Sequence, residues 1–236
     1  RNRDLRTTGE AVTNDDPNLP VVSLVARALG DLRQEFMLVG GCAVGLLITD
    51  RARPPVRQTV DVDLVNEVAS ISDYYALRPK LNETGFKEDQ FDDHFCRWRK
   101  GSLILDVMPT TEVFGHSVNR WYAGAARSSQ VHTLPSGETI NVITAPFFIA
   151  TKLESFNSRG GGDYMHHDME DILNIVDGRP ELLEELEKSP DAVREFIRDE
   201  LDEYLADPDF TDKLEWHFPH ERSKLVIQRL RRLAGL

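Results

Sequence analysis

The pattern of apolar residues changes at Pro146, and this change constrains the fold more than any single motif. Before Pro146, short β-branched or apolar runs alternate with stretches whose apolar residues recur every three or four positions, which indicates strands and helices. After Pro146, every long segment has the helical period. We therefore expect an α/β (α+β) fold, with a flexible lead-in at 1–20, a mixed-sheet core at 21–145 and a helical C-terminal part at 146–236.

The expected elements follow from these periods and from the Gly and Pro residues between them. In the first part we expect helices at 21–36, 42–48, 68–81 and 120–127, and strands at 37–39, 59–65, 94–99, 103–108, 131–134 and 139–143. The last two strands are expected to form a hairpin. In the second part we expect helices at 147–156, 169–176, 180–206 and 219–233.

The net charge of −12 is concentrated in one segment. Residues 181–215 carry 14 acidic and 4 basic side chains, whereas the other 201 residues carry 26 acidic and 24 basic ones. Most of the chain is therefore close to neutral, which is compatible with a nucleic-acid partner. We expect the acidic segment to be a solvated face; docking of a basic partner, such as an antitoxin protein, is the alternative.

The sequence lacks the features of a membrane or secreted protein. No run approaches the roughly 18 apolar residues of a membrane span, and no charged-then-apolar leader pattern opens the chain. The two cysteines, Cys42 and Cys96, are too few for a disulfide scaffold. We expect a cytoplasmic protein with free thiols and no membrane partner.

The sharpest motif is an Asp-x-Asp inside the β-branched run 59–65. Side chains alternate along a strand, so Asp61 and Asp63 are expected to share one face, with Val60, Val62 and Leu64 turned toward the core. Two carboxylates roughly 7 Å apart at Cβ are suited to a pair of divalent ions. A second Asp-x-Asp, at 207–209, contains Pro208 and is expected to be a solvated loop.

A third acid, Asp106, interrupts the apolar strand 103–108. A buried carboxylate is costly unless a cation neutralises it, so Asp106 should have a basic or metal partner. If this strand lies beside 59–65, three carboxylates converge in an oxygen-rich site of the kind that Mg²⁺ prefers.

Gly40 and Gly41 lie between a predicted strand and a predicted helix, about twenty residues before Asp61. Glycines at such a place let the backbone approach a phosphate near free N–H donors. A plain tight turn is the alternative.

Taken together, Gly40-Gly41, Asp61-x-Asp63 and Asp106 resemble the signature of the nucleotidyltransferase superfamily of the DNA polymerase β type, over residues 20–110. Lys152, Arg159 and the run 168–172, Asp-Met-Glu-Asp-Ile, are similar to the Lys…Arg…Lys-Asp-x-x-Asp-Leu/Ile pattern of AbiEii-type nucleotidyltransferases, which include toxins of bacterial toxin–antitoxin and phage-defence systems. This extends the resemblance to about residue 180. His167 departs from it by replacing the Lys that usually precedes the Asp, and Gly160–Gly162 lengthens the gap.

The resemblance implies a role for each matching residue. Asp61, Asp63 and Asp106 would bind two Mg²⁺ ions, or Mn²⁺, and Asp106 would help to deprotonate the attacking hydroxyl. Gly40, Gly41, Thr59 and Lys152 would contact the nucleoside triphosphate. Asp168 and Asp171 would complete the nucleotide site by orienting their helix or the acceptor. The implied reaction transfers a nucleoside monophosphate to a hydroxyl and releases pyrophosphate.

Several residues have simpler interpretations. Lys152 is equally compatible with a surface lysine whose stem lies along apolar neighbours, and Asp168 with an acid that favours a helix N-terminus. Arg51, Arg53 and Arg57 fit either a phosphate-binding loop or a solvated one. The basic residues at 222–232 suit a nucleic-acid stripe or the positive end of a helix. No zinc site is expected from His166 and His167.

Three functional hypotheses follow. The first is Mg²⁺-dependent nucleotidyl transfer to RNA or tRNA in a bacterial toxin–antitoxin or phage-defence setting. The second keeps the reaction but changes the acceptor to a small, antibiotic-like molecule or a protein. The third is a nucleotide- or partner-binding module without catalysis, against which the presence of all three aspartates argues.

Overall fold

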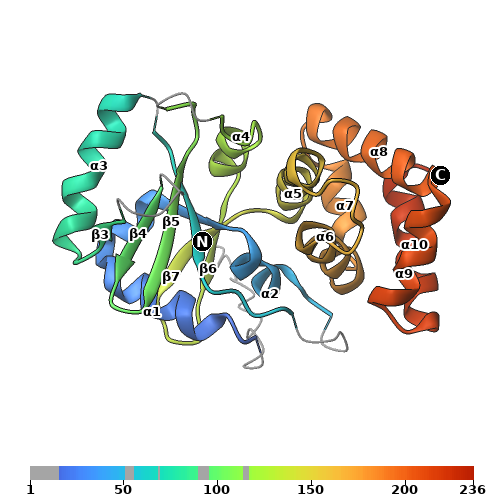
Figure 1. Cartoon of the computed structure of the whole chain (residues 1–236), viewed down its shortest axis with the longest axis horizontal. Helices are drawn as coiled ribbons and strands as arrows, with labels where there is room; N and C mark the ends of the chain where they lie inside the picture. Colours follow the sequence, from blue (N-terminus) through green and yellow to red (C-terminus); the bar gives the residue numbers. More distant parts are fainter. Residues whose placement is uncertain (1–15, 51–55, 69, 90–95, 114–116) are drawn as a thin grey trace, which may run out of the picture.

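The protein was analysed as a computed structural model, which describes residues 16–50, 56–68, 70–89, 96–113 and 117–236. A mixed seven-stranded sheet comes first in the chain, and a set of helices follows it (Figure 1). This confirms the expected fold class. Of the expected lead-in, residues 1–15 lie outside the described residues, while Asp16 and Asn18 are already buried.

The sheet has the order β3-β4-β5-β2-β1-β7-β6. Its strands are β1 (Phe36–Val39), β2 (Val62–Asn66), β3 (Lys87–Glu88), β4 (Arg97–Lys100), β5 (Leu103–Pro109), β6 (Gln130–Thr133) and β7 (Thr139–Val142). The pairs β2–β5 and β1–β7 are parallel, and the other neighbours are antiparallel. The predicted hairpin of β6 and β7 is therefore confirmed.

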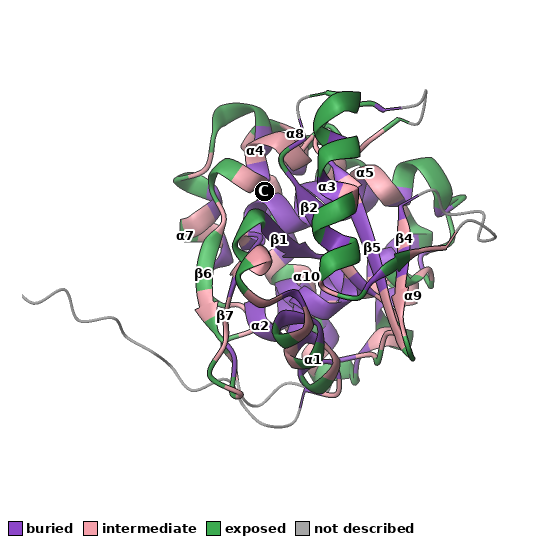
Figure 2. Cartoon of the chain, turned by 90° about the vertical axis from the view of Figure 1, so that its left-hand side faces the viewer, coloured by how far each residue is buried: buried purple, intermediate pink, exposed green. Residues whose placement is uncertain are grey.

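Four helices accompany the sheet: α1 (Leu19–Leu29), α2 (Val44–Leu47), α3 (Ile71–Glu83) and α4 (Tyr122–Arg127). In Figure 2, α1 and α3 lie in front of strands whose residues are buried. Helix α3 turns Tyr74, Leu77 and Leu81 inward, at the three- and four-residue spacing of an amphipathic helix. The helical part lies on the other side of the sheet from α3 (Figure 1).

The helical part consists of α5 (Ala145–Arg159), α6 (His167–Gly178), α7 (Leu182–Glu187), α8 (Asp191–Ala206), α9 (Pro208–His217) and α10 (His220–Ala234). Helix α5 contacts α4 on the sheet side and α6, α7 and α8 on the other. Most of its residues are buried, including Phe148, Ile149 and Leu153. It is therefore the central helix of this part, and the division into separate domains stays a prediction.

Two local predictions were wrong in the first part. The helix expected at 21–36 stops at Leu29, because Gly30 takes a positive φ of 57° and begins a 3₁₀ segment that leads into β1. The strand expected at 59–65 begins only at Val62. Val60 consequently lies outside the sheet and is 77% exposed, where the alternation had placed it in the core.

The second Asp-x-Asp is a helix start and not a loop. Asp207 is the N-cap of α9 and accepts a hydrogen bond from the Asp209 N–H at 2.9 Å, and Pro208 is the first helical residue. This is the usual chemistry of an N-terminus, where Pro loses nothing by lacking an N–H. The acidic block is also divided, since α7 ends before Ser189-Pro190 and α8 begins after it.

Cys42 and Cys96 are both buried free thiols, as predicted. Among the described helices, none combines the length and the apolar character that crossing a membrane requires.

The position of α5 predicts a large effect of truncating its core side chains. We expect Ile149→Ala to lower the free energy of unfolding by about 2–5 kcal/mol, because Ile149 is 1% exposed and its removal leaves a cavity. Urea unfolding followed by circular dichroism measures the change. Ser158→Ala, at an exposed position of the same helix, is the control and should stay within about 0.5 kcal/mol of the wild type.

Candidate functional site

The sheet register brings the predicted carboxylates together. Asp63 on β2 lies directly opposite Asp106 on β5 in a parallel pair. Adjacent strands are about 4.8 Å apart, and residues in register point to the same face, so these two side chains are neighbours. Asp61 comes just before β2, and one guanidinium bridges its carboxylate to that of Asp106. The convergence expected of the three aspartates is therefore present; their role as metal ligands stays a prediction.

The cation expected beside Asp106 is Arg97. It lies on β4, opposite Asp106 in the antiparallel register. Its Nε donates to Oδ1 of Asp106 at 2.8 Å and its Nη2 to Oδ2 at 2.7 Å, a bidentate pair. The same Nη2 donates to Oδ2 of Asp61 at 3.0 Å. Nothing in the sequence singled out Arg97, because only the β4–β5 register places it at this position.

Position 40 requires glycine for two reasons: the conformation of its backbone and the close approach of the Asp63 carboxylate. Its φ of 65° and ψ of −164° lie in a region that is essentially open to glycine only. A Cβ at this position would lie 2.0 Å from Oδ2 of Asp63. A Cβ at Gly41 would lie 2.6 Å from Cγ2 of Thr59. The two glycines thus let the turn after β1 pack directly against Asp63 and the segment before β2.

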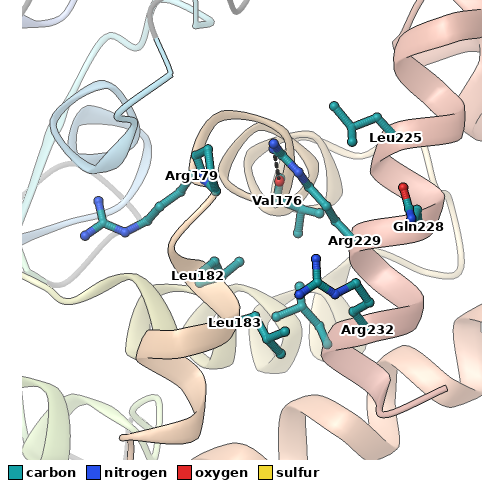
Figure 3. A pocket seen from close by; sticks show the side chains of 10 residues that line it. Val176, Arg179, Leu182, Leu183, Leu225, Gln228, Arg229 and Arg232 are labelled. Atoms are coloured by element: carbon teal, nitrogen blue, oxygen red, sulfur yellow. Dashed lines mark hydrogen bonds between the residues drawn. The ribbon is translucent and has the colours of Figure 1, made fainter.

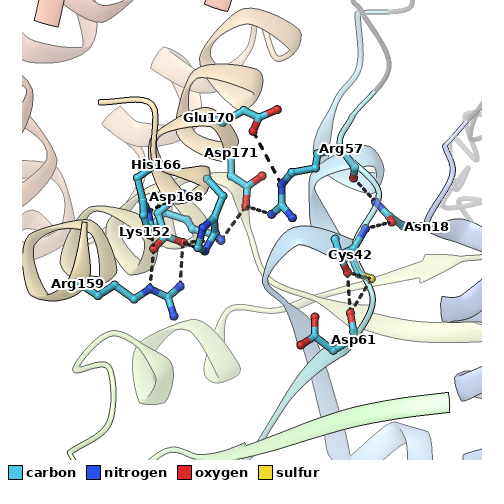
Figure 4. Close-up of polar contacts among 12 residues, drawn as sticks. Asn18, Cys42, Arg57, Asp61, Lys152, Arg159, His166, Asp168, Glu170 and Asp171 are labelled. Atoms are coloured by element: carbon cyan, nitrogen blue, oxygen red, sulfur yellow. Dashed lines mark hydrogen bonds and ion pairs between the residues drawn. The ribbon is translucent and has the colours of Figure 1, made fainter. Parts of the chain in front are cut away.

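Thr59 has a structural use in this segment. Its hydroxyl donates to the carbonyl of Asp61 at 2.7 Å, and its N–H donates to Oδ1 of Asn18 at 2.8 Å. The thiol of Cys42 also donates to the Asp61 carbonyl, at 3.4 Å (Figure 4). These contacts fix the backbone of Asp61, which the sheet does not hold. Asn18 was missed by the sequence analysis, which assigned it to the lead-in.

Asp63 is the least compensated carboxylate of the three. No described residue forms an ion pair or hydrogen bond with it in the structure. Burial and the neighbouring charges of Asp61 and Asp106 raise the pKa of Asp63 to about 7, although Lys152 and Arg159 act in the opposite direction. A desolvated carboxylate among like charges is held at a cost that a divalent cation would remove.

A second ionic cluster joins α5 to α6. The ammonium of Lys152 lies 2.9 Å from Oδ1 of Asp168 and 2.7 Å from Oδ2 of Asp171. Arg159 donates to both oxygens of Asp168, at 2.8 and 2.9 Å. Figure 4 shows Asp171 between Lys152 and Arg57, whose Nη2 is 3.5 Å away. Asp168 and Asp171 do share one helix face, as predicted.

Lys152 does not lie in the solvated environment that one of its two interpretations expects, and its contact with a nucleotide stays a prediction. It is buried and paired with two carboxylates, so it is not a solvated surface lysine. Burial alone would lower the pKa of Lys152, but Asp171 and Asp168 outweigh it and raise that pKa. Burial alone would likewise raise the pKa of Asp168, and Arg159 and Lys152 hold it well below its usual range. Lys152 and Asp168 are therefore both charged at neutral pH.

The two histidines at the start of α6 are close to this cluster. His166 is the N-cap and accepts from the N–H of Asp168 at 3.2 Å. One ring nitrogen each of His166 and His167 and one oxygen of Asp168 lie within 4.8 Å of one another, an arrangement able to hold a metal ion. Because Asp168 is already neutralised by two cations, a further cation would be repelled there.

Two basic residues of α10, Arg222 and Arg229, join this helix to α6. Arg222 pairs with Asp177 on α6 and, at 2.8 Å, with Asp50. Lys224 pairs with Glu221. Arg229 donates to the carbonyls of Val176 and Asp177 and lines a pocket of about 210 Å³ between α6, α7 and α10 (Figure 3). Arg51 and Arg53, the other candidate cations, lie outside the described residues.

Comparison with known proteins gives only distant likenesses. No family model matches the chain, and no curated protein matches it. It is similar to the structure of an antigenic nucleotidyltransferase-like protein from Paracoccidioides brasiliensis, with 21% identity over 70% of this chain and 80% of that one, at a TM-score of 0.47.

Two structures of the antibiotic-resistance factor ANT(2'')-Ia are also similar to it. The solution structure has 14% identity over 66% of this chain and 81% of that one, at a TM-score of 0.45. The complex with adenylyl-2''-tobramycin has 14% identity over 66% of this chain and 86% of that one, at a TM-score of 0.43.

The geometry of the glycine turn predicts the result of its smallest substitution. We expect Gly40→Ala to cost about 1–3 kcal/mol of stability from the backbone conformation alone. It should also displace Asp63, because the new Cβ and the carboxylate cannot share the space. Unfolding curves and divalent-ion binding measure the two effects. Gly137→Ala is the control: it has a positive φ but nothing near its Cβ, so it should lose stability only. Unchanged ion binding in Gly40→Ala would contradict this role.

The second cluster predicts a pH-dependent stability. Since the pKa of Asp168 is lowered by folding, its contribution is complete above the unfolded value of about 4 and is lost as the pH falls further. We expect Asp168→Asn to cost about 3 kcal/mol at pH 7, because Lys152 and Arg159 lose a charged partner, and the difference from the wild type to shrink below about pH 4.

Urea unfolding at several pH values tests this. Glu170→Gln, on the same first turn of α6 but more exposed, is the matched control and should show a small difference that changes little with pH. An Asp168→Asn deficit of equal size at every pH would mean that its charge is not the source.

Proposed function

We propose that the chain is a nucleotidyltransferase that moves a nucleoside monophosphate from an NTP to an acceptor hydroxyl. The observation that carries this is the placement of Asp61, just before β2, beside Asp63 on β2 and Asp106 on β5, with Asp63 lacking a partner among the described residues. The donors are all carboxylate oxygens, which fits Mg²⁺, or Mn²⁺ in its place. Asp61, Asp63 and Asp106 would hold these ions, which supply charge neutralisation at the phosphates.

The residues around the carboxylates suit the substrate side of this reaction. The Gly40 turn brings backbone within contact of Asp63, so a triphosphate held there would meet no side chain from the turn. In the reaction, the acceptor oxygen forms a bond to the α-phosphorus, the bond to the pyrophosphate oxygen breaks, and pyrophosphate leaves. Asp106 takes part in removing the hydroxyl proton, in an orientation that Arg97 maintains.

The positive charges across from the carboxylates would act on the triphosphate in two ways. Lys152 is paired with Asp168 and Asp171, so it would act on the triphosphate only through its electrostatic field. The same pairs keep α5 and α6 in place. Arg159 is 56% exposed, and its Nη1 donates to no described residue. We assign to Arg159 the direct contact with phosphate that the resemblance had assigned to Lys152.

The acceptor is proposed in two forms. RNA or tRNA, in a cytoplasmic toxin–antitoxin setting with a cognate antitoxin, rests on the resemblance to AbiEii-type proteins. A small hydroxylated molecule is the second candidate, and one observation favours it. Arg222 and Arg229 are engaged with α6 and Lys224 pairs with Glu221, so α10 offers an interrupted basic stripe whose exposed arginines are Arg231 and Arg232.

The assay of choice follows label from α-³²P NTPs. Purified protein with Mg²⁺ and each NTP in turn is offered bulk tRNA, a mixture of aminoglycosides, or no added acceptor. Label on RNA supports the first acceptor, label on a small molecule the second, and label on the protein itself a polypeptide acceptor. NTP binding without any transfer would support a non-catalytic binding module.

Variants of the two Asp-x-Asp motifs provide a matched pair. We expect Asp61→Asn and Asp63→Asn each to lower transfer more than about a hundredfold, because even residues that only orient metal ligands cost about 10–100-fold. Asp209→Asn alters the second motif, at an exposed helix start, and should retain transfer. Wild-type activity in Asp61→Asn or Asp63→Asn would refute the assignment of the metal site.

A further inference from the structure

Arg97 occupies an unusual position between two carboxylates of different origin. Asp106 is its cross-strand neighbour within the sheet, so their bidentate pair is a contact between β4 and β5. Asp61 lies outside the sheet, before β2, and only the second contact of Nη2 joins it to the same guanidinium. A purely structural pair would need Asp106 alone.

These contacts engage the oxygens that a cation would need. Arg97 binds both oxygens of Asp106 and Oδ2 of Asp61, at 2.7–3.0 Å. A divalent ion shared by Asp61 and Asp106 would lie against the same oxygens and within a few ångströms of the guanidinium. Two cations at such a distance repel each other strongly, even in a water-like dielectric.

We propose that Arg97 is a positioning residue. Its guanidinium neutralises Asp61 and Asp106 until a divalent cation binds between these two carboxylates. Ion binding then exchanges the Asp61 contact of Arg97 for the ion, while the bidentate pair with Asp106 stays in place. This inference rests on the proposed function, since it assumes that the carboxylates take a divalent ion.

The shape of the guanidinium explains why arginine occupies this position. Its planar fork binds one carboxylate through two parallel N–H groups and leaves a further N–H of Nη2 for a second carboxylate. Releasing Asp61 therefore need not release Asp106. A lysine would carry the same charge on a single ammonium and would be unable to keep one carboxylate fixed while exchanging the other.

The test is Mn²⁺ binding without nucleotide, measured from the EPR signal of the free ion. We expect Arg97→Gln to bind Mn²⁺ about tenfold more tightly than the wild type, because a positive charge that competes for the same carboxylate oxygens is removed. Arg97→Lys keeps the charge but loses the fork, so its affinity should lie between the two. In transfer assays, the Mg²⁺ concentration for half-maximal rate should fall in Arg97→Gln while kcat also falls.

Arg99→Gln is the matched control. Arg99 is on the same strand and pairs with Asp89, and it makes no described contact with the three carboxylates. Its substitution removes the same charge at a greater distance, so we expect an affinity within about twofold of the wild type, because exposed charges further away are screened by salt. Unfolding curves establish whether each variant is folded. If Arg97→Gln does not fold, the Mn²⁺ affinity of Arg97→Lys is compared with that of the wild type instead.

The outcomes separate this inference from the proposed function. Unchanged or weaker Mn²⁺ binding in Arg97→Gln, or an equal gain in Arg99→Gln, overturns the role of Arg97 while the metal site stands. An Mn²⁺ affinity in Asp63→Asn equal to that of the wild type would refute the assignment of the metal site itself. Absence of Mn²⁺ binding in the wild type and in both Arg97 variants overturns both.

Discussion

The cost of placing carboxylates inside a folded protein governs this structure. Asp106 is in the middle of an otherwise apolar strand, and the register of β4 supplies Arg97 to neutralise it. Asp63, its neighbour on β2, has no such partner among the described residues, and its raised pKa reflects the electrostatic penalty. The sheet thus holds a buried acid, Asp106, beside a partly buried one, Asp63, and compensates only the first. That imbalance is what makes the site receptive to further positive charge.

The same principle applies in the helical part, with the opposite result. Asp168 and Asp171 are buried on α6, but Lys152 and Arg159 from α5 satisfy Asp168 on several sides. This cluster is balanced, and it holds α5 against α6. Because Lys152 and Arg159 also act on the pKa of Asp63, the helical part contributes to the electrostatics of the sheet site without contributing a carboxylate ligand to it. The two basic residues that hold α5 against α6 therefore also influence the charge of the carboxylate site on the sheet.

Contacts with α6 engage two of the basic residues of α10. Arg222 and Arg229 bind the C-terminal end of α6, where unpaired carbonyls and Asp177 accept hydrogen bonds. Cations at the end of a helix are favourable for its dipole as well. A count of basic residues along α10 therefore overstates the charge that is open to a nucleic acid. The acidic segment differs, since Asp199, Asp202 and Glu203 on α8 are exposed.

Local features of this protein could be predicted from its amino-acid sequence. Hydrophobic periods located most helices after Pro146, α9 excepted, and most strands before it, because side-chain spacing follows directly from helix and strand geometry. Gly40, Asp61, Asp63 and Asp106 stood out because an acid in an apolar strand and a paired glycine are visible in a few residues. Element ends were less well predicted: Gly30 and the cap at Asp207 depend on backbone conformations that composition suggests only weakly.

Which of these features come into contact depends on the packing of distant segments. The β2–β5 register placed Asp106 beside Asp63, and the β4–β5 register brought Arg97 to Asp106 and to Asp61. The packing of α5 on α6 gave Lys152 two carboxylate partners in place of solvent. Each contact joins segments that are distant in the chain, and the periodicity of one segment carries no information about the register of another. The charge balance of the site is therefore a property of the fold.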